Sequence, residues 1–231
     1  MPTSKVVVDA APGVALDAPY GYVGGTQDNH VVQALVSFFC DAGLHVATYD
    51  ARGVGSSSGK MTWTMRAESR DYQAVVDAMA ARVETHGTPE LYLCGYSAGA
   101  IQASTAEAPQ GWETAEVRYV LLAYPLGVRW ALTCLSGTYF QNAVERVVKR
   151  AATEPNVAAL VLTTTADQFT SAASYSTWTT SLASTHESKG LRLVSLPQDH
   201  FFASHAALGS LADALRAWCT DLHIGESGVG R

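Results

Sequence analysis

Residues 91–104 combine an apolar run, a serine between two glycines and a helix-forming run in immediate succession. The apolar run at 91–94 is typical of a buried strand, and residues 98–104 favour a helix. Gly95 and Gly99 stand two positions before and after Ser97, so the backbone can turn tightly without a side-chain clash. The order strand, sharp turn, helix, with Ser97 at the tip, is typical of a nucleophile elbow. A glycine-rich turn with an idle serine is the alternative.

The predicted turn would give Ser97 surroundings suited to nucleophilic attack. Its hydroxyl would project above the edge of the sheet, and the following helix would begin at Ala98. The first N–H groups of a helix have no acceptor within the helix, and they carry the positive end of its dipole. The N–H of Ala98 is therefore a candidate donor to the oxyanion that forms when Ser97 attacks a carbonyl group.

The whole chain alternates between strand-like and helix-like segments. We expect strands at 6–9, 14–17, 44–49, 91–95, 117–123, 157–163 and 191–196, and helices at 28–42, 64–85, 98–107, 138–151, 171–188 and 203–222. This alternation predicts an α/β fold with a mostly parallel sheet and helices on both faces. No linker or internal repeat interrupts residues 1–231, so we expect one domain, with frayed ends at 1–4 and 225–231.

Composition argues against several kinds of partner. The chain has 231 residues, of which 48% are hydrophobic, so it can bury one large core. Its net charge is −6 and it has no long basic run, which argues against nucleic-acid binding. No apolar stretch is long enough to span a membrane, and residues 1–5 lack the apolar run of a secretory signal. We therefore expect a cytoplasmic protein; the sequence does not indicate its oligomeric state.

The cysteines and histidines do not indicate a metal site. Cys40, Cys94, Cys134 and Cys219 show no paired spacing, which favours four reduced thiols. The seven histidines are equally scattered, so no metal-ligand spacing is present. We expect no metal and no organic cofactor.

A serine nucleophile needs a base, and the base needs an acid that orients it. His200 is the candidate base, because it follows the strand predicted at 191–196 and precedes the last helix. Asp167 is the candidate acid, because it follows the strand predicted at 157–163. Polar residues after parallel strands meet at the carboxyl edge of the sheet. The chain order Ser97, Asp167, His200 is also the order expected after a nucleophile elbow.

Alternatives remain open for the acid. Asp199 is adjacent to His200, and a neighbouring residue is poorly placed to bond the ring nitrogen that faces away from Ser97. Asp167 could instead be an ordinary helix N-cap beside Phe169.

Three segments together resemble the α/β-hydrolase superfamily: residues 95–99 (GYSAG), 50–59 (DARGVGSSSG) and 199–202 (DHFF). Within it, the chain is similar to small, nearly cap-less serine hydrolases. These carry a loop His-Pro-His-Pro-x-x-Gly-Gly-Thr-x-Asp-Asn before their first helix. Residues 24–29 (GGTQDN) match the end of that loop, and Pro19 matches its first proline. The resemblance spans about 19–222 and implies the α/β-hydrolase fold with a minimal cap.

The chain departs from that loop at three positions. Ala18 and Tyr20 replace the two histidines, and Gly21 replaces the second proline. In the family this loop lends the second N–H of the oxyanion hole. A backbone donor does not depend on its side chain, so the resemblance implies that Tyr20 or Gly21 supplies it. The short N-terminus also implies that the leading antiparallel strands of the family are reduced or missing.

The resemblance implies hydrolysis of an ester or related acyl bond in a small molecule. Ser97, His200 and Asp167 would form the catalytic triad, and the N–H of Ala98 would stabilise the oxyanion together with that of Tyr20 or Gly21. Thioester or peptide cleavage by the same triad is a second possibility, because leaving-group preference depends on pocket shape. A catalytically inactive binding scaffold is a third, supported only by the altered loop.

Overall fold

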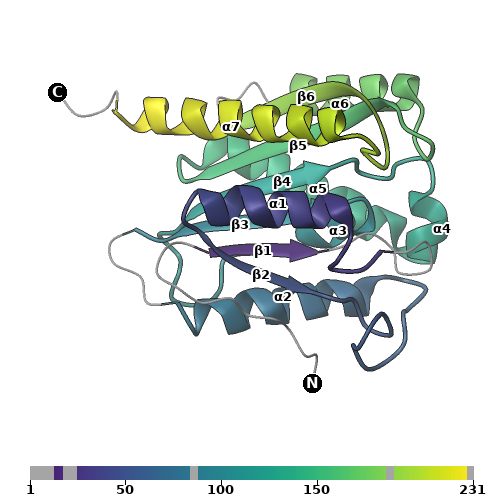
Figure 1. The fold of residues 1–231 in the computed structure, drawn as a ribbon, viewed down its shortest axis with the longest axis horizontal. Coiled ribbons are helices and arrows are strands. Elements are labelled where there is room, and N and C mark those ends of the chain that lie inside the picture. The colour runs from purple at the N-terminus through teal and green to yellow at the C-terminus, as the bar shows by residue number, and fades with distance from the viewer. Residues whose placement is uncertain (1–12, 18–24, 84–87, 186–189, 228–231) are drawn as a thin grey trace.

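A six-stranded sheet forms the centre of the molecule (Figure 1). The structure is a computed structural model, and it describes residues 13–17, 25–83, 88–185 and 190–227. The strands are β1 (Gly13–Asp17), β2 (His45–Tyr49), β3 (Glu90–Tyr96), β4 (Glu116–Leu122), β5 (Val157–Ala166) and β6 (Leu191–Asp199). Their order is β2-β1-β3-β4-β5-β6, and each neighbouring pair is parallel. All six carboxyl ends therefore meet at one edge of the sheet.

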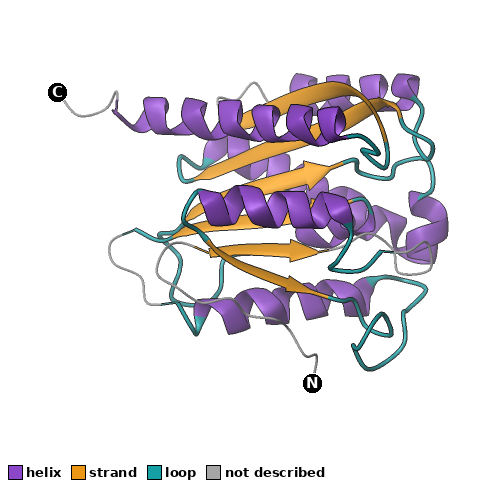
Figure 2. Ribbon diagram, viewed as in Figure 1, coloured by secondary structure: helices purple, strands orange, loops and turns teal. Residues whose placement is uncertain are grey.

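Helices cover both faces of this sheet (Figure 2). The helices of the described residues are α1 (His30–Asp41), α2 (Arg66–Ala80), α3 (Ala98–Ala103), α4 (Arg129–Thr133), α5 (Gly137–Thr153), α6 (Ala172–Thr185) and α7 (His205–Ser227), with a 3₁₀ turn at Cys134–Ser136. Side chains of α1 and α7 share one apolar core with the sheet, whereas those of α2, α3, α5 and α6 share the other. This confirms the predicted α/β architecture.

The central strand β3 shows why its sequence is apolar at nearly every position. Leu91 and Leu93 pack into the core beneath α2, α3 and α5, whereas Tyr92, Cys94 and Tyr96 pack into the core beneath α1 and α7. Successive residues of a strand point to opposite faces, so a strand covered on both faces needs apolar residues throughout.

Helix α1 begins where the sequence places a capping residue. The side-chain oxygen of Asn29 accepts a hydrogen bond of 2.9 Å from the backbone N–H of Val31. Val31, Leu35 and Phe39 then recur at helical spacing and are buried against the sheet. Burying each of these side chains contributes about 1.5–3 kcal/mol.

Several boundaries differ from the sequence-based prediction. Helix α3 ends at Ala103 rather than near residue 107, because the hydroxyls of Ser104 and Thr105 bond back to Ile101 and Gln102 carbonyls. Helix α2 ends at Ala80 rather than at residue 85, and strand β6 extends through residues 197–199. Helix α7 continues to Ser227, three residues into the tail that we expected to be frayed. Gly225 within it costs only about 1 kcal/mol relative to alanine, which is too little to end the helix there. The strand predicted at 6–9 lies outside the described residues.

The cap is minimal, as the resemblance implied. Only α4 and the 3₁₀ turn stand between the end of β4 and the start of α5, and α5 itself packs on the sheet. In the part of the chain that the structure describes, no helix combines the length and apolar character that a membrane span requires.

Candidate active site

Ser97 occupies a sharp turn between β3, which ends at Tyr96, and α3, which begins at Ala98. Its backbone angles are φ 57° and ψ −119°, which a residue with a side chain rarely adopts. Its own N–H donates a 2.9 Å hydrogen bond to the carbonyl of Leu122, which ties the turn to the end of β4. The chain thus holds Ser97 in a strained conformation of the kind that clusters at functional sites.

Gly95 explains how the turn can be so tight. A Cβ atom added at Gly95 would lie 2.1 Å from the carbonyl oxygen of Gly99. Only glycine fits at this close approach of strand and helix, as the spacing of the pentapeptide indicated.

The ring of His200 bridges Ser97 and Asp167. Its Nε2 lies 2.9 Å from the Oγ of Ser97, and its Nδ1 lies 2.7 Å from Oδ2 of Asp167. An ionised carboxylate can only accept, so the hydrogen-bond network assigns the ring proton to Nδ1. Nε2 is then free to accept the proton of the Ser97 hydroxyl.

Asp167 is held by donors on both oxygens. Oδ1 accepts from the N–H groups of Phe169 and Thr170 at 2.8 and 2.9 Å, and Oδ2 accepts from the hydroxyl of Thr164 at 2.8 Å. Burial of the carboxyl works against ionisation, but the hydrogen bond and charge of His200, together with those donors, hold the pKa of Asp167 below its usual value. The side chain is 0% exposed. It does not cap α6, because the Ser171 hydroxyl takes that role by accepting from the N–H of Ser174.

The backbone of His200 is held as firmly as its ring. Its N–H donates to Oε1 of Gln168 at 3.0 Å, and its carbonyl accepts from the hydroxyl of Tyr96 at 2.8 Å. Asp199 instead accepts a long hydrogen bond of 3.4 Å from the N–H of Ala203. The structure therefore places Asp167, and not Asp199, against Nδ1 of His200.

A β-bulge precedes His200. The pairing of β5 with β6 shifts by one residue between Thr164 and Ala166, and β6 carries the extra residue. Pro197 lies in this irregular stretch, where a residue without an N–H is tolerated. Bulges re-aim the side chains that follow them, and here His200 follows directly after the end of β6 at Asp199.

Three aromatic rings surround the imidazole of His200. Phe169 lies edge-on at 4.6 Å between ring centroids, Phe201 lies edge-on at 5.5 Å, and Tyr96 lies at 5.5 Å. With this cover His200 is only 2% exposed, although Ser97 beside it keeps 8%. The rings shield the His200–Asp167 hydrogen bond from water, which strengthens it.

The oxyanion side of the site is described in part. Ala98 is the first residue of α3, so its N–H has no acceptor within that helix. Tyr20 and Gly21, the predicted second donors, lie outside the described residues, as does Gly24.

Sequence reasoning missed the residues that support the triad. Each of Thr164, Gln168 and Tyr96 forms a hydrogen bond with Asp167 or His200. Each of these three lies no more than three residues from a predicted triad member. Proximity in sequence was the available signal, but many polar neighbours share it. Tyr175, whose hydroxyl lies 3.3 Å from Oδ2 of Asp167, had no signal beyond being an aromatic residue in a Ser/Thr-rich helix.

Comparison with solved structures identifies the fold. An α/β serine hydrolase homologue from Coxiella burnetii is 19% identical with a TM-score of 0.65, over 93% of this chain and 90% of that chain. A serine hydrolase without a lid from Xanthomonas campestris is 22% identical with a TM-score of 0.62, over 93% and 87%. The chain has the α/β-hydrolase fold. Est1E from Butyrivibrio proteoclasticus, solved with ferulic acid bound, is 16% identical with a TM-score of 0.68, over 96% of each chain.

Sequence comparison adds a narrower match. Residues 23–123 of the chain match the family model described as serine aminopeptidase, S33. This segment contains β2, β3, the Ser97 turn and α3, but neither Asp167 nor His200. No curated protein matches the chain.

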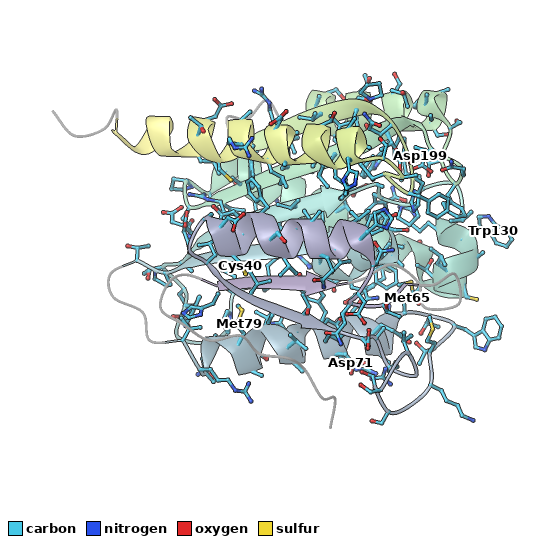
Figure 3. All side chains as sticks on the ribbon, viewed as in Figure 1. Cys40, Met65, Asp71, Met79, Trp130 and Asp199 are labelled. Carbon is cyan, nitrogen blue, oxygen red and sulfur yellow. The ribbon has the colours of Figure 1, made fainter. Side chains whose placement is uncertain are left out.

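Ser97, Asp167 and His200 lie at the carboxyl edge of the sheet, where they follow strands β3, β5 and β6. Figure 3 shows Asp199 and Trp130 toward the edge at which the strand arrows of Figure 1 end. Among the described residues, no group of three or more histidines, cysteines or acidic residues could hold a metal ion.

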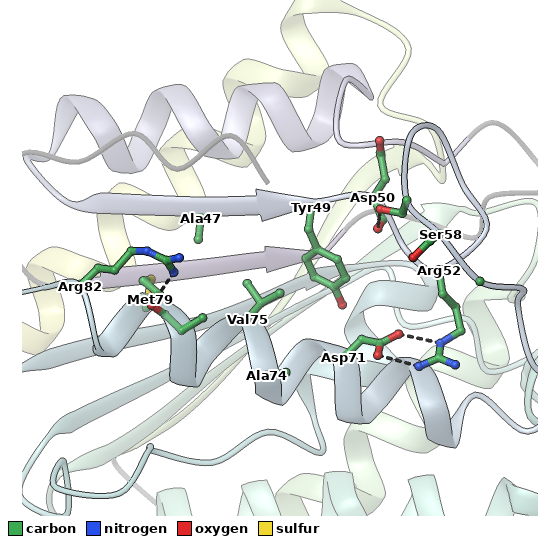
Figure 4. Close-up of a pocket in the computed structure, with 13 residues that line it drawn as sticks. Ala47, Tyr49, Asp50, Arg52, Ser58, Asp71, Ala74, Val75, Met79 and Arg82 are labelled. Atoms are coloured by element: carbon green, nitrogen blue, oxygen red, sulfur yellow. Dashed lines mark hydrogen bonds and ion pairs between the residues drawn. The ribbon is translucent and has the colours of Figure 1, made fainter. Parts of the chain in front are cut away.

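Two cavities lie away from this site. One of about 520 Å³ lies between β2 and α2, with the ion pair of Arg52 and Asp71 at one end and Arg82 toward the other (Figure 4). Another of about 670 Å³ lies between α5 and α6. None of the residues that line them is Ser97, Asp167 or His200. Neither is therefore the place where the serine would meet its substrate.

Proposed function

We propose that this chain is a serine hydrolase that cleaves an ester or related acyl bond through a covalent acyl-enzyme. The observation that carries the proposal is the unbroken row of hydrogen bonds from Ser97 Oγ to His200 Nε2 at 2.9 Å and from His200 Nδ1 to Asp167 Oδ2 at 2.7 Å. This arrangement matches, by roles and distances, the triad of serine hydrolases.

The first chemical step follows from these distances. Nε2 of His200 accepts the hydroxyl proton as Oγ of Ser97 attacks the carbonyl carbon of the substrate. The imidazolium that results keeps its Nδ1–H on the ionised Asp167, which stabilises the positive charge. Nε2–H then donates its proton to the leaving group, and the acyl group stays on Ser97.

Water completes the cycle by the same route. Nε2 of His200 takes a proton from water, whose oxygen attacks the acyl carbon, and Ser97 recovers its proton as the acid product leaves. In both steps the N–H of Ala98 faces the negative charge on the carbonyl oxygen. The second donor of the oxyanion hole is proposed to be Tyr20 or Gly21. Each such donor contributes about 2.7–4 kcal/mol to stabilising the transition state.

The proposed substrate is a small acyl compound, and an ester is the favoured class. Two proteins of this fold, from Butyrivibrio proteoclasticus and Pyrococcus furiosus, support this, since one was solved with ferulic acid bound and the other is described as an esterase. A thioester or peptide substrate is the alternative within the same mechanism, and the match to the serine aminopeptidase model favours testing it. We also propose that the protein acts in the cytoplasm without a cofactor.

A fluorophosphonate probe tests the proposal directly. We expect wild-type protein to be labelled on Ser97, located by peptide mass spectrometry, and Ser97→Ala to be neither labelled nor active. Ser104→Ala is a matched control, because Ser104 is a buried serine just after α3 whose hydroxyl bonds to the carbonyl of Ile101. Activity in a folded Ser97→Ala variant would refute the mechanism. A wild-type protein that resists the probe and every member of a panel of esters, thioesters and aminoacyl amides would favour the binding scaffold.

A further inference from the structure

The carboxylate of Asp167 has all of its acceptor positions filled. A carboxylate offers about four lone-pair positions, two on each oxygen. Two backbone N–H groups take those of Oδ1, and His200 and Thr164 take those of Oδ2 at 2.7 and 2.8 Å. Oδ1 is therefore held by the loop backbone, whereas the oxygen that faces His200 is held by side-chain hydroxyls, of which that of Thr164 is the nearer.

The location of Thr164 suits this task. It lies near the carboxyl end of β5, where it is 1% exposed, just before the turn that carries Asp167. The adjacent Thr163 is 3% exposed, and its hydroxyl donates instead to the carbonyl of Val194 at 3.4 Å. Because consecutive strand residues point to opposite faces, these two buried threonines have different partners.

Tyr175 is a weaker candidate for the same role. Its hydroxyl lies 3.3 Å from Oδ2 of Asp167 but 2.9 Å from the carbonyl of Tyr124. It has one proton to donate, and the closer acceptor is the carbonyl. Thr164 is thus the better placed of the two hydroxyls.

We propose that Thr164 is a positioning residue of the triad, whose hydroxyl holds Oδ2 of Asp167 in line with the Nδ1–H of His200. The inference rests on the proposed function, because it assumes that His200 acts as the base for Ser97. Without the hydroxyl, Oδ2 would lose its nearest hydroxyl donor while Oδ1 stays bonded to the loop backbone, so the carboxylate would be held less firmly against rotation about its Cβ–Cγ bond and the ring of His200 would be aimed less precisely at Ser97. A misplacement of about 1 Å in such a site can cost about 10²-fold in rate.

The hydroxyl also helps to keep the carboxyl group of Asp167 ionised. The hydrogen bond from Thr164 is one of the interactions that lower the pKa of Asp167, so its removal should raise that pKa and let the carboxylate take up a proton at higher pH. The titratable groups that face this pair are Tyr96 on β3 and Tyr175 on α6, with Asp199 at the end of β6. Burial raises the pKa of both tyrosines well above the usual range, so they stay neutral across the working pH. His30, whose Nε2 contacts the carbonyl of Phe201, faces the next residue along the chain.

The experiment compares Thr164→Ser with Thr164→Ala, because both lose the same methyl group and differ only in the hydroxyl. Hydrolysis of p-nitrophenyl acetate is followed across pH, and folding is checked by circular dichroism and urea unfolding. We expect Thr164→Ser to stay within a few-fold of wild type. Thr164→Ala should lose about 10- to 100-fold in kcat with little change in KM, and the acidic limb of its pH profile should move to higher pH.

Thr163→Ala is the matched control, since it removes the neighbouring buried hydroxyl without touching Asp167. Equal kcat values and pH profiles for Thr164→Ala, Thr164→Ser and Thr163→Ala would overturn the inference. So would a larger loss in Tyr175→Phe than in Thr164→Ala, which would assign the role to Tyr175. Ser97→Ala, measured in parallel, separates the two levels: a loss there with no effect at Thr164 refutes only the positioning role, whereas an active Ser97→Ala refutes the proposed function.

Discussion

Gly95→Ala adds only one carbon atom, but it should displace the backbone of the Ser97 turn. The added Cβ would lie 2.1 Å from the carbonyl oxygen of Gly99, 2.3 Å from its carbon and 2.5 Å from the nitrogen of Ala100. Contacts below 3.0 Å essentially never occur for Cβ atoms, so the start of α3 must move away from β3 by about an ångström. All three atoms belong to the backbone, and no side chain can rotate to relieve the clash.

The cost can be estimated from similar changes. Forcing an extra carbon into close-packed surroundings costs typically about 1–3 kcal/mol of folding free energy. The displaced atoms also carry Ser97 and the N–H of Ala98, so catalysis should suffer separately from stability. A shift of about 1 Å corresponds to about a 10²-fold loss in rate.

Urea unfolding measures the loss of stability, and hydrolysis of p-nitrophenyl acetate measures the loss of the proposed activity. Gly209→Ala is a suitable control, because Gly209 lies within α7 and a Cβ there would meet nothing within 4 Å. That change should stabilise the protein by about 0.5–1 kcal/mol and leave turnover unchanged. A Gly95→Ala protein with wild-type stability and wild-type turnover would show that strand and helix are not in close contact at this point.

Three further predictions concern other parts of the molecule. Asp167→Asn should lower kcat by about 10³–10⁴-fold, as for orienting acids in other triads, whereas Asp199→Asn should change it little; the reverse ranking in steady-state kinetics would mean that Asp199 is the acid. Leu160→Ala, at a fully buried position of β5, should cost about 2–5 kcal/mol in urea unfolding. Because the pKa of Asp167 is depressed in the folded state, this group stabilises the protein above roughly pH 4 and the effect is lost as the pH falls through the folded pKa; acid unfolding of Asp167→Asn should therefore show a smaller dependence on pH in that range.

The sequence was sufficient for the sheet and its helices because their patterns are local. Apolar runs located β3 and β5, and helical spacing located α1, because each element buries the face that its own residues define. Helix α4 was not predicted, because five residues are too few to show a period. These elements position the site but do not by themselves define it.

The site itself could be predicted only as far as strand ends could be located. The structure brings Ser97, Asp167 and His200 together because β3, β5 and β6 are parallel and their carboxyl ends share an edge. The support from Thr164 and Tyr175 could not be predicted, since it depends on which way a hydroxyl points across a packed interface. Sequence patterns carry period and order, but they carry no information about that direction.

The bulge before His200 places one more residue in β6 than regular pairing with β5 requires. Ala166 of β5 pairs with Asp199, and two residues of β6, rather than one, bridge the interval from Leu196 to that pair. A relative with one residue fewer in this interval could pair regularly and still present its histidine opposite the same point of β5. Deleting one residue between Leu196 and Asp199 should therefore shorten β6 by the bulge alone and leave Asp199 paired with Ala166.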